Sequence, residues 1–353
     1  MKKSISIIVL ISTLLWILLG TAGCGKSYET RTKSFYEYFD TVSIISSYGD
    51  ETDEGFEKIC KDLSGMLESY HKLFDIYYEY SGVNNLCTVN KNAGKQPVSV
   101  CTELLDFLEY CKELFILTGG ETNIAMGAVL KIWHRYRERA LDDASGSSTS
   151  VPSMAELMAA AEHTSIDSIV IDREAGTVFI SDPEASIDVG AIGKGYATER
   201  AAKMLLDRGV TSYVLNIGGN IRTIGEKPNS EKWVTGITNP DRSSEERFAC
   251  RISIGETSCV TSGNYERYFE HNGVRYHHII DKDSLIPAGY FSSVTVICKD
   301  SGLADALSTA LFCMNESDGR RLVQEIGGVE VLWITKDFKT SMTDGFRNLL
   351  IND

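Results

Sequence analysis

The alternation of apolar and polar positions along the chain predicts both helices and strands. Apolar residues recur every three or four positions from Glu54 to Phe74 and from Thr102 to Leu117, which gives a helix one apolar face. Aromatic and β-branched residues fill Phe35 to Ser47, which is typical of a strand. The same reasoning predicts helices over 154–163, 194–208, 303–314 and 319–326, strands over 169–171, 178–180, 213–217 and 329–334, and mostly strand and turn over 233–296. These elements indicate an α+β protein with a substantial mixed or antiparallel sheet.

The first residues follow a different pattern. An apolar run from Ile5 to Leu19 comes after Lys2 and Lys3 and before small residues, as in a secretory signal peptide. Cys24 directly follows Ala22-Gly23 and resembles the lipobox of bacterial lipoproteins, in which this cysteine is acylated. An uncleaved anchor helix and an ordinary signal peptide are the alternatives, and both also place the remaining chain outside the cytoplasm. We expect a signal peptide over 1–23, a lipidated tether over 24–33 and one folded domain over 34–353, anchored to the cell membrane.

Composition and charge narrow the class of protein. The net charge of −14 argues against binding to nucleic acid and against electrostatic adhesion to anionic lipid. The nine cysteines contain no CxxC pair, so a zinc site is not expected. Beyond Cys24 we expect mostly buried free thiols, with room for one disulfide. The Ser-, Gly- and Asp-rich segment Ala140 to Ser153 predicts a mobile surface loop.

Glycines punctuate two strand ends in the second half of the chain. In Ile187 to Tyr196 a strand passes through three glycines into a helix, and such a turn presents backbone N–H groups and Lys194 to a phosphate. Close helix–strand packing is the alternative role for these glycines. Leu215 to Asn220 ends in a double glycine that lets a ligand or another backbone approach closely.

Two further segments carry side chains with chemistry. Val260 to Tyr268 is rich in hydroxyls, and it precedes the adjacent His277 and His278, of which only one can face a given pocket. Asp305 and Thr309 are four residues apart, so they lie on one face of the predicted helix. Together with a backbone carbonyl this pair suits Mg²⁺, whereas local hydrogen bonds between them are the alternative.

Taken in order, these segments resemble the ApbE family, the FAD:protein FMN transferases. The resemblance starts at Phe39-Asp40-Thr41 and runs through LFDIY at 73–77 and TNIAMG at 122–127. It continues through IDVGAIGKGYATERAA, LNIGGNI, TSGNYERYF, HHIID and ADALSTALF, and so spans about residues 35–345. It implies an ApbE-like, T-fold-related architecture of mixed or antiparallel sheets with packed helices.

The resemblance also implies roles for individual residues. The backbone carbonyl of Ala191 and the side chains of Asp305 and Thr309 are expected to hold Mg²⁺, and His278 is expected to act on the acceptor hydroxyl. Tyr77 stands at a position associated with transferase activity, where relatives with a smaller polar residue can hydrolyse FAD. The residues expected at the FAD site are Phe39, Tyr77, Asn123, Ala125, Met126, Asp188, Lys194, Gly195, Gly218, Gly219, Thr261, Ser262, Gly263, Asn264, His278 and Ile279.

The implied reaction moves FMN from FAD onto a Thr or Ser hydroxyl of an exported or membrane flavoprotein and releases AMP. Asn123 and Asn264 stand where many family members have Asp, and Lys282 replaces the usual Pro after HIID. Two other functions compete with this one: an Mg²⁺-dependent FAD pyrophosphatase that yields FMN and AMP, and a non-catalytic FAD-binding lipoprotein. Tyr77 argues against the first, and Asp305, Thr309 and His278 together argue against the second.

Overall fold

The structure is a computed structural model that describes residues 29–142 and 149–351. The predicted signal peptide and Cys24 lie outside these residues, as does the middle of the predicted loop Ala140 to Ser153. Within the described ranges, no helix combines the length and the apolar character that crossing a membrane requires.

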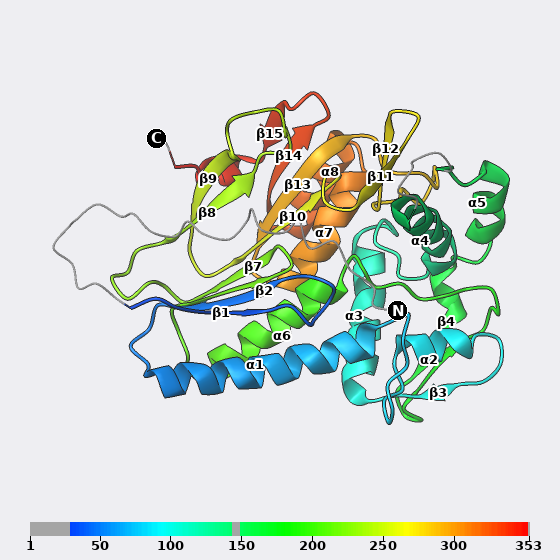
Figure 1. Ribbon diagram of the computed structural model, residues 1–353, viewed down its shortest axis with the longest axis horizontal. Coiled ribbons are helices and arrows are strands. Elements are labelled where there is room, and N and C mark those ends of the chain that lie inside the picture. The colour runs from blue at the N-terminus through cyan, green and yellow to red at the C-terminus, as the bar shows by residue number, and fades with distance from the viewer. Residues whose placement is uncertain (1–28, 143–148, 352–353) are drawn as a thin grey trace.

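An eight-stranded sheet forms the centre of the fold (Figure 1). Its strand order is β1-β2-β6-β7-β10-β13-β14-β15, and each neighbouring pair runs antiparallel. The strands are β1 (Arg31–Phe35), β2 (Ser43–Ser47), β6 (Tyr213–Ile217), β7 (Asn220–Ile224), β10 (Ser258–Gly263), β13 (Phe291–Cys298), β14 (Glu330–Thr335) and β15 (Thr340–Met342). Strand β13 is buried along its whole length because other elements cover both faces of the sheet.

Helices cover one face of this sheet. α6 (Gly193–Asp207) and α7 (Ser301–Cys313) lie against each other and against the strands, and α1 (Asp53–Phe74) packs outside α6 (Figure 1). The contacts are apolar, with Leu63 of α1 against Ala201 and Leu205 of α6. α8 (Glu316–Ile326) completes this layer beside β14. The hairpin β8 (Trp233–Thr238)–β9 (Phe248–Ile254) contributes to a separate cluster with Cys259, Ile297 and Leu332 of the sheet.

A second group of elements extends the molecule beyond the ends of α1 and α6 (Figure 1). It contains α2 (Leu86–Lys91), α3 (Thr102–Leu117) and a small sheet of β3 (Val98–Ser99), β5 (Thr177–Ile180) and β4 (Ile169–Asp172). Next to it lie α4 (Gly127–Asp142), α5 (Met154–Ala161) and the hairpin β11 (Tyr268–His271)–β12 (Val274–His277). The short helix α9 (Asp344–Arg347) follows β15. The predicted α+β class is confirmed.

Residues 35–47 do not form the single strand that their composition predicts. They belong to β1 and β2, which pair antiparallel across a connection in which Phe39 and Asp40 have φ values of 56° and 51°. Two consecutive left-handed residues reverse the chain, and an apolar or β-branched composition does not reveal such a turn. β1 also begins at Arg31, so the folded part of the chain starts inside the segment expected to be a tether.

Helix α4 is absent from the predicted elements, although it contributes residues to the site described below. Only Gly127, Val129 and Trp133 are buried along it. Leu130 and Tyr136 continue the apolar stripe at helical spacing and are partly buried against the same cluster. The packing of Trp133 is tertiary: its ring stacks on Tyr276 of β12 at a centroid distance of 5.8 Å, and its Nε1 donates to the carbonyl of Leu285.

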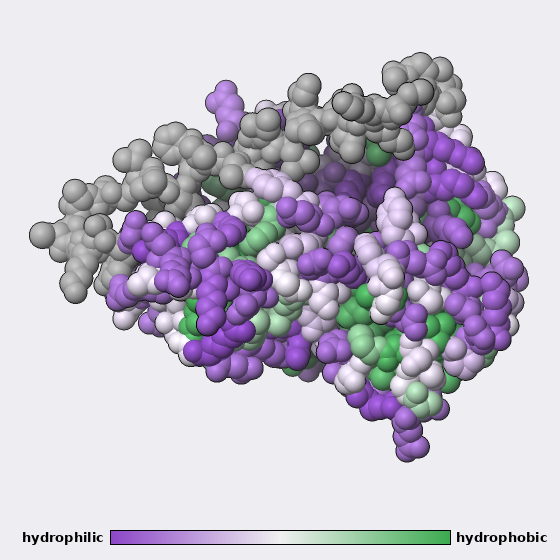
Figure 2. Space-filling model, turned by 60° about the horizontal axis from the view of Figure 1, so that its bottom comes forward, coloured by the Kyte–Doolittle hydropathy of each residue, from purple (hydrophilic) through white to green (hydrophobic). Residues whose placement is uncertain are grey.

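The eight described cysteines are free thiols, which confirms the expectation for them. Six are buried, Cys250 is half-buried and Cys101 is exposed. Polar and charged residues dominate the face of the molecule in Figure 2, and apolar residues appear between them in patches. Such a mainly hydrophilic surface with apolar patches is usual for a globular protein.

Candidate active site

The site forms where the N-terminal turn of α6 crosses α7. The Gly195 N–H of α6 donates to Asp305 Oδ2 of α7 at 2.8 Å. This contact requires glycine, because a Cβ on residue 195 would overlap the carbonyl of Ser301 and the Cβ of Asp305. Gly195 therefore serves the close packing of α6 on α7, which is one of the two roles predicted for the glycines of the 187–196 segment.

Gly195→Ala is expected to lower the free energy of unfolding by about 1–3 kcal/mol, the usual cost of overpacking a tight contact. Gly65→Ala in the middle of α1 is the matched control, because a Cβ there meets nothing within 4 Å. The control should instead stabilise the protein by about 0.5–1 kcal/mol through helix propensity. Urea unfolding of both variants measures the difference, and equal shifts in the two variants would contradict the close approach of α6 and α7.

Asp305 is a buried carboxylate with one oxygen to spare. It is 5% exposed, and Lys194 Nζ lies 3.9 Å from its Oδ2. Burial raises the pKa of Asp305, while Lys194 and the Gly195 N–H act in the opposite direction. Among the described residues, Oδ1 receives no hydrogen bond. A buried carboxylate with an open oxygen is a good ligand for a hard cation.

Hydroxyl groups surround the same turn of α7. Ser262 Oγ of β10 lies 2.8 Å from Ser308 Oγ and 3.4 Å from Thr309 Oγ1. Ser308 Oγ in turn donates to the Asp305 carbonyl. Thr261 is one position earlier on β10, and its hydroxyl bonds instead to Thr295 of β13 at 2.8 Å. Because successive side chains of a strand point to opposite faces of the sheet, Ser262 faces Ser308 and Thr309 of α7, and Thr261 lies on the other face beside Thr295.

The double-glycine turn closes another side of the site. Gly218 has φ of +59°, and a Cβ there would lie 2.6 Å from Thr41 Cγ2 and 3.2 Å from Lys194 Cδ. Gly219 N donates to Asn216 Oδ1 at 3.0 Å, and the position of its missing Cβ opens into free space. The turn between β6 and β7 therefore brings its backbone next to Lys194.

Two other segments carry predicted site residues: the end of β10 and the loop after α3. Gly263 packs over the Tyr265 ring, and Asn264 N donates to the Ser292 carbonyl. Asn123 Oδ1 accepts from Ala125 N, and its Nδ2 donates to the Thr164 carbonyl. Asn123 thus stabilises its own loop with both halves of its amide, a task that a carboxylate in its place could not perform in full.

The loop carrying Asn123 runs beside the segment that leads into α6. Met126 forms a parallel bridge with Ser186, and Asp188 N donates to the Ile124 carbonyl at 2.9 Å. Asp188 Oδ1 accepts from Gly190 N, which shapes the turn that presents the Ala191 carbonyl. The side chains of Ala125 and Met126 are buried, so they hold the backbone of this loop in place.

The two adjacent histidines have different environments. His277 is 6% exposed, its Nε2 lies 3.0 Å from the Ala288 carbonyl, and its Nδ1 accepts from Ile279 N. Burial lowers its pKa to about 4. His278 is half-buried, and its Nδ1 lies 3.2 Å from the Arg267 carbonyl. Burial, Arg267, His277 and Lys194 lower the pKa of His278 to about 3. His277 is thus a structural residue. Ile279, two positions later, is buried in the core around α7.

His277 should make the protein acid-sensitive. Its pKa falls from 6.5 to about 4 on folding, so below pH 6.5 the unfolded chain takes up a proton that the folded chain refuses. The stability linked to His277 is complete above pH 6.5 and is lost toward pH 4, by about 3 kcal/mol. Free energies of unfolding at pH 7 and pH 4 measure this loss. His277→Gln should lose less than the wild type over the same interval; an equal loss would exclude His277 as the cause.

Phe39 and Tyr77 border the site from the segments around α1. Phe39 N donates to His71 Nδ1, and its ring meets the His71 ring edge-on at a centroid distance of 5.8 Å. Tyr77 is 53% exposed, and its hydroxyl lies 3.0 Å from Nδ1 of His134 in α4. His134 Nδ1 is in turn 4.0 Å from Asp188 Oδ2.

A sequence model of the ApbE family matches residues 39–333 of the chain. The chain belongs to the ApbE family. The FAD:protein FMN transferase of Treponema pallidum is 29% identical to it over 352 residues, which are 95% of this chain and 93% of that protein. Two solved structures agree over 92% of this chain and 100% of their own, each at 26% identity. They are the ApbE protein of Thermotoga maritima, with a TM-score of 0.79, and the flavin transferase ApbE of Vibrio cholerae, with a TM-score of 0.76.

Three charged or polar residues of this ApbE-family chain lie at the site without having been predicted there. They are His134 and Arg137 of α4 and Arg267, which precedes β11. Arg267 helps to lower the pKa of His278, and both arginines act against protonation of His134. His134 and Arg137 are three residues apart and so share a helix face. This spacing could have indicated from the sequence that the two side chains lie together, but only if residues 127–142 had been recognised as a helix.

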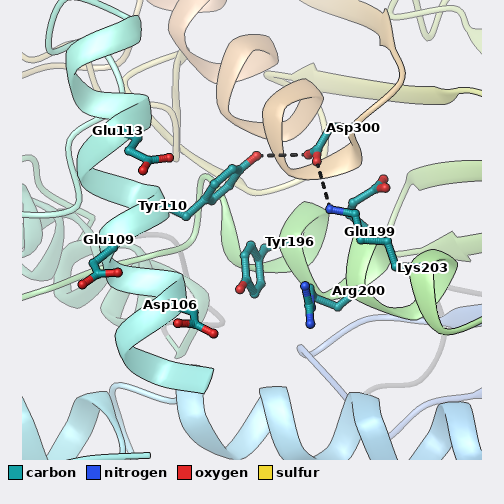
Figure 3. Close-up of a pocket in the computed structure, with 9 residues that line it drawn as sticks. All are labelled: Asp106, Glu109, Tyr110, Glu113, Tyr196, Glu199, Arg200, Lys203 and Asp300. Atoms are coloured by element: carbon teal, nitrogen blue, oxygen red, sulfur yellow. Dashed lines mark hydrogen bonds and ion pairs between the residues drawn. The ribbon is translucent and has the colours of Figure 1, made fainter. Parts of the chain in front are cut away.

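A separate hollow of about 310 Å³ lies between α3, α6 and the start of α7 (Figure 3). Acidic residues of α3 line one wall. On the other side, Asp300 accepts from Tyr110 at 3.0 Å and lies 3.9 Å from Lys203 Nζ. None of the predicted site residues of the ApbE-family chain lines it. Within the described ranges, no three His, Cys, Asp or Glu side chains form a metal-binding group.

Proposed function

We propose that this protein transfers FMN from FAD to a Thr or Ser hydroxyl of an exported or membrane flavoprotein and releases AMP. Membership of the ApbE family and the activity named for its relatives support the class of reaction. The observation that carries the proposal for this chain is the convergence of Lys194, Gly195 and Asp305 at the crossing of α6 and α7. A cation and a buried carboxylate meet there, and a site for a pyrophosphate and its metal requires both.

The residues at this crossing fit Mg²⁺. The donor set consists of the open Oδ1 of buried Asp305, the Thr309 hydroxyl one turn later and the Ala191 carbonyl before α6, all of them hard oxygen ligands. When bound, Mg²⁺ would neutralise negative charge on the pyrophosphate and orient it. The single carboxylate leaves coordination positions for phosphate oxygens and water, which is the usual arrangement for Mg²⁺ on a phosphorylated substrate.

The protein's own groups account for the remaining steps. Lys194, which lies beside the Gly218-Gly219 turn, would bind the phosphates, and the half-buried His278 would accept the proton of the acceptor hydroxyl. A bond then forms between that hydroxyl oxygen and the phosphorus on the FMN side. The bond from this phosphorus to the oxygen shared with AMP breaks, and AMP leaves. Burial and neighbouring cationic groups lower the pKa of His278, so its imidazole is neutral near pH 7 and has a free electron pair for the proton.

Incubation of the purified protein with FAD, Mg²⁺ and an acceptor domain tests the function. Intact-mass spectrometry of the acceptor should detect a gain of one FMN that requires Mg²⁺, and AMP should appear in equal amount. Free FMN and AMP with an unmodified acceptor would establish FAD hydrolysis instead. FAD that stays bound and intact would establish a flavin carrier.

We further propose that residues 1–23 are a signal peptide and that Cys24 carries the lipid that anchors the protein outside the cytoplasm. The basic start, the short apolar run and the small residues before Cys24 support this. Labelled fatty acid should be incorporated by the wild type and not by Cys24→Ser. Equal labelling of both would exclude lipidation at Cys24.

A further inference from the structure

A buried carboxylate joins α6 to the first turn of α7. Glu199 of α6 is 5% exposed and borders the hollow beside the start of α7 (Figure 3). Its Oε2 accepts from Ser301 N at 2.9 Å. Ser301 is the first residue of α7, so its N–H has no partner within the helix. A negative charge at this end of a helix is also favoured by the helix dipole.

This contact lies one helical turn away from the contact between Gly195 and Asp305. Glu199 comes four residues after Gly195 on α6. Ser301 comes four residues before Asp305 on α7. Residues four apart share a helix face, so the two contacts lie side by side on the same faces of the two helices. Two contacts fix the rotation of one helix on the other, whereas a single contact fixes only their distance.

A buried arginine ties the same carboxylate to the central sheet. Arg222 of β7 is 4% exposed, and its Nε donates to Glu199 Oε2 at 3.1 Å. The same guanidinium donates to the Thr223 carbonyl at 2.6 Å, and its Nη2 lies 4.0 Å from Glu256 Oε1. β7 directly follows the double-glycine turn. Glu199 thus connects three elements that meet at the candidate metal site.

The burial of these charges indicates that their arrangement has a use. Moving a carboxylate and a guanidinium out of water costs free energy, and their attraction often only offsets that cost, so a buried ion pair is weak evidence for stability. Such a pair can instead select one arrangement of the elements that it joins. Here it joins α6, whose start follows Ala191, to α7, which carries Asp305 and Thr309.

We propose that Glu199 is a positioning residue for the metal site. Its contact with Ser301 fixes the rotation of α7 on α6, and this rotation sets the direction of Asp305 Oδ1. The inference rests on the Mg²⁺-dependent function proposed above. Glu199 acts through α7 rather than on the metal itself. Loss of the contact should weaken Mg²⁺ binding about tenfold, the lower end of the loss caused by removing an outer partner of a metal site.

Two variants separate the contact from the stability of the fold. Glu199→Gln keeps an oxygen that can accept from Ser301 N, but it removes the charge that balances Arg222. Its melting temperature should fall, while its affinity for Mg²⁺ should stay close to that of the wild type. Glu199→Leu combined with Arg222→Met removes both charges, so it should melt closer to the wild type than Glu199→Gln does. Leucine accepts no hydrogen bond, so this double variant should bind Mg²⁺ about tenfold more weakly.

Calorimetric titration of Mg²⁺ into the protein saturated with FAD measures the affinity, and titration of Mg²⁺ into FAD alone is the blank. Thermal denaturation without ligands measures the stability. Asp62→Ala is the control on the other side of α6. Asp62 of α1 lies 2.7 Å from Arg208 at the end of α6, so its removal breaks an ion pair of this helix without touching α7. Its affinity for Mg²⁺ should equal that of the wild type.

The order of the two variants decides the proposal. Weak Mg²⁺ binding in the more stable double variant, with near-wild-type binding in the less stable Glu199→Gln, would support it. Affinities that follow the melting temperatures would overturn it, because Glu199 would then only stabilise the fold. If one variant does not fold, the other decides alone: wild-type affinity in the double variant, or weakened affinity in Glu199→Gln, would overturn the positioning role.

Failure of the proposed function has a different signature. A wild type that binds Mg²⁺ but neither modifies an acceptor nor releases AMP would refute the transferase, while the affinities of the variants would still decide the role of Glu199. A wild type that binds no Mg²⁺ in the presence of FAD would overturn the positioning role together with the metal site.

Discussion

Asp305→Ala is expected to abolish Mg²⁺-dependent turnover, with a loss of about a thousandfold or more, because a bound metal contributes several kcal/mol to phosphoryl transfer. Asp305 is the only carboxylate of the predicted metal ligands, and it is almost fully buried. Its removal leaves a hydroxyl and a carbonyl, neither of which carries a formal charge. Formation of AMP and of FMN-modified acceptor at saturating FAD measures the loss.

Thermal denaturation separates metal binding from chemistry. Mg²⁺ with FAD should raise the melting temperature of the wild type, since a ligand that binds only the folded state stabilises it, and the rise due to Mg²⁺ should be absent in Asp305→Ala. Asp300→Ala is the matched control. It removes a carboxylate that caps the same helix by accepting from Leu303 N at 2.9 Å. Stability should fall by about 1 kcal/mol while turnover persists. Wild-type turnover in Asp305→Ala would refute the assigned metal site.

His278→Ala is expected to lower transfer by about a hundredfold to ten-thousandfold, the usual contribution of a general base, while FAD binding is retained. The reason is that His278 is the half-buried histidine of the pair, whereas both ring nitrogens of His277 are already engaged by the backbone. Single-turnover transfer to the acceptor measures the loss, and flavin fluorescence measures the binding.

The pH profile provides a second test of His278. Its pKa of about 3 leaves the imidazole neutral from pH 5 upward, so kcat/KM for FAD should show no fall from its protonation between pH 5 and pH 8. A group with a depressed pKa loses its function only when the pH approaches that value from above. Loss of FAD binding in His278→Ala would contradict the assignment as a base. A step near pH 6.5 that disappears in this variant would instead show that the pKa of His278 is not depressed in the working enzyme.

Local patterns predicted elements well where one face of the element is broadly apolar. α1 and α3 carry such faces, and α3 covers the predicted range Thr102–Leu117. Helix α4 was not predicted, although Val129, Trp133 and Tyr136 recur at helical spacing. In 35–47 the left-handed turn at Phe39 and Asp40 interrupts a strand-like composition, and composition does not encode such a turn.

By itself, the sequence determined the helix that carries Asp305 and Thr309 on one face, the glycines that permit close approach, and the opposite orientations of His277 and His278. These follow from spacing within a few residues, because the period of a helix or strand is a local property. The tertiary structure decided which distant groups meet. Gly195 and Asp305 are 110 residues apart, and Tyr77 and His134 are 57 apart. Such contacts depend on how whole elements pack, so no pattern within either segment specifies its partner.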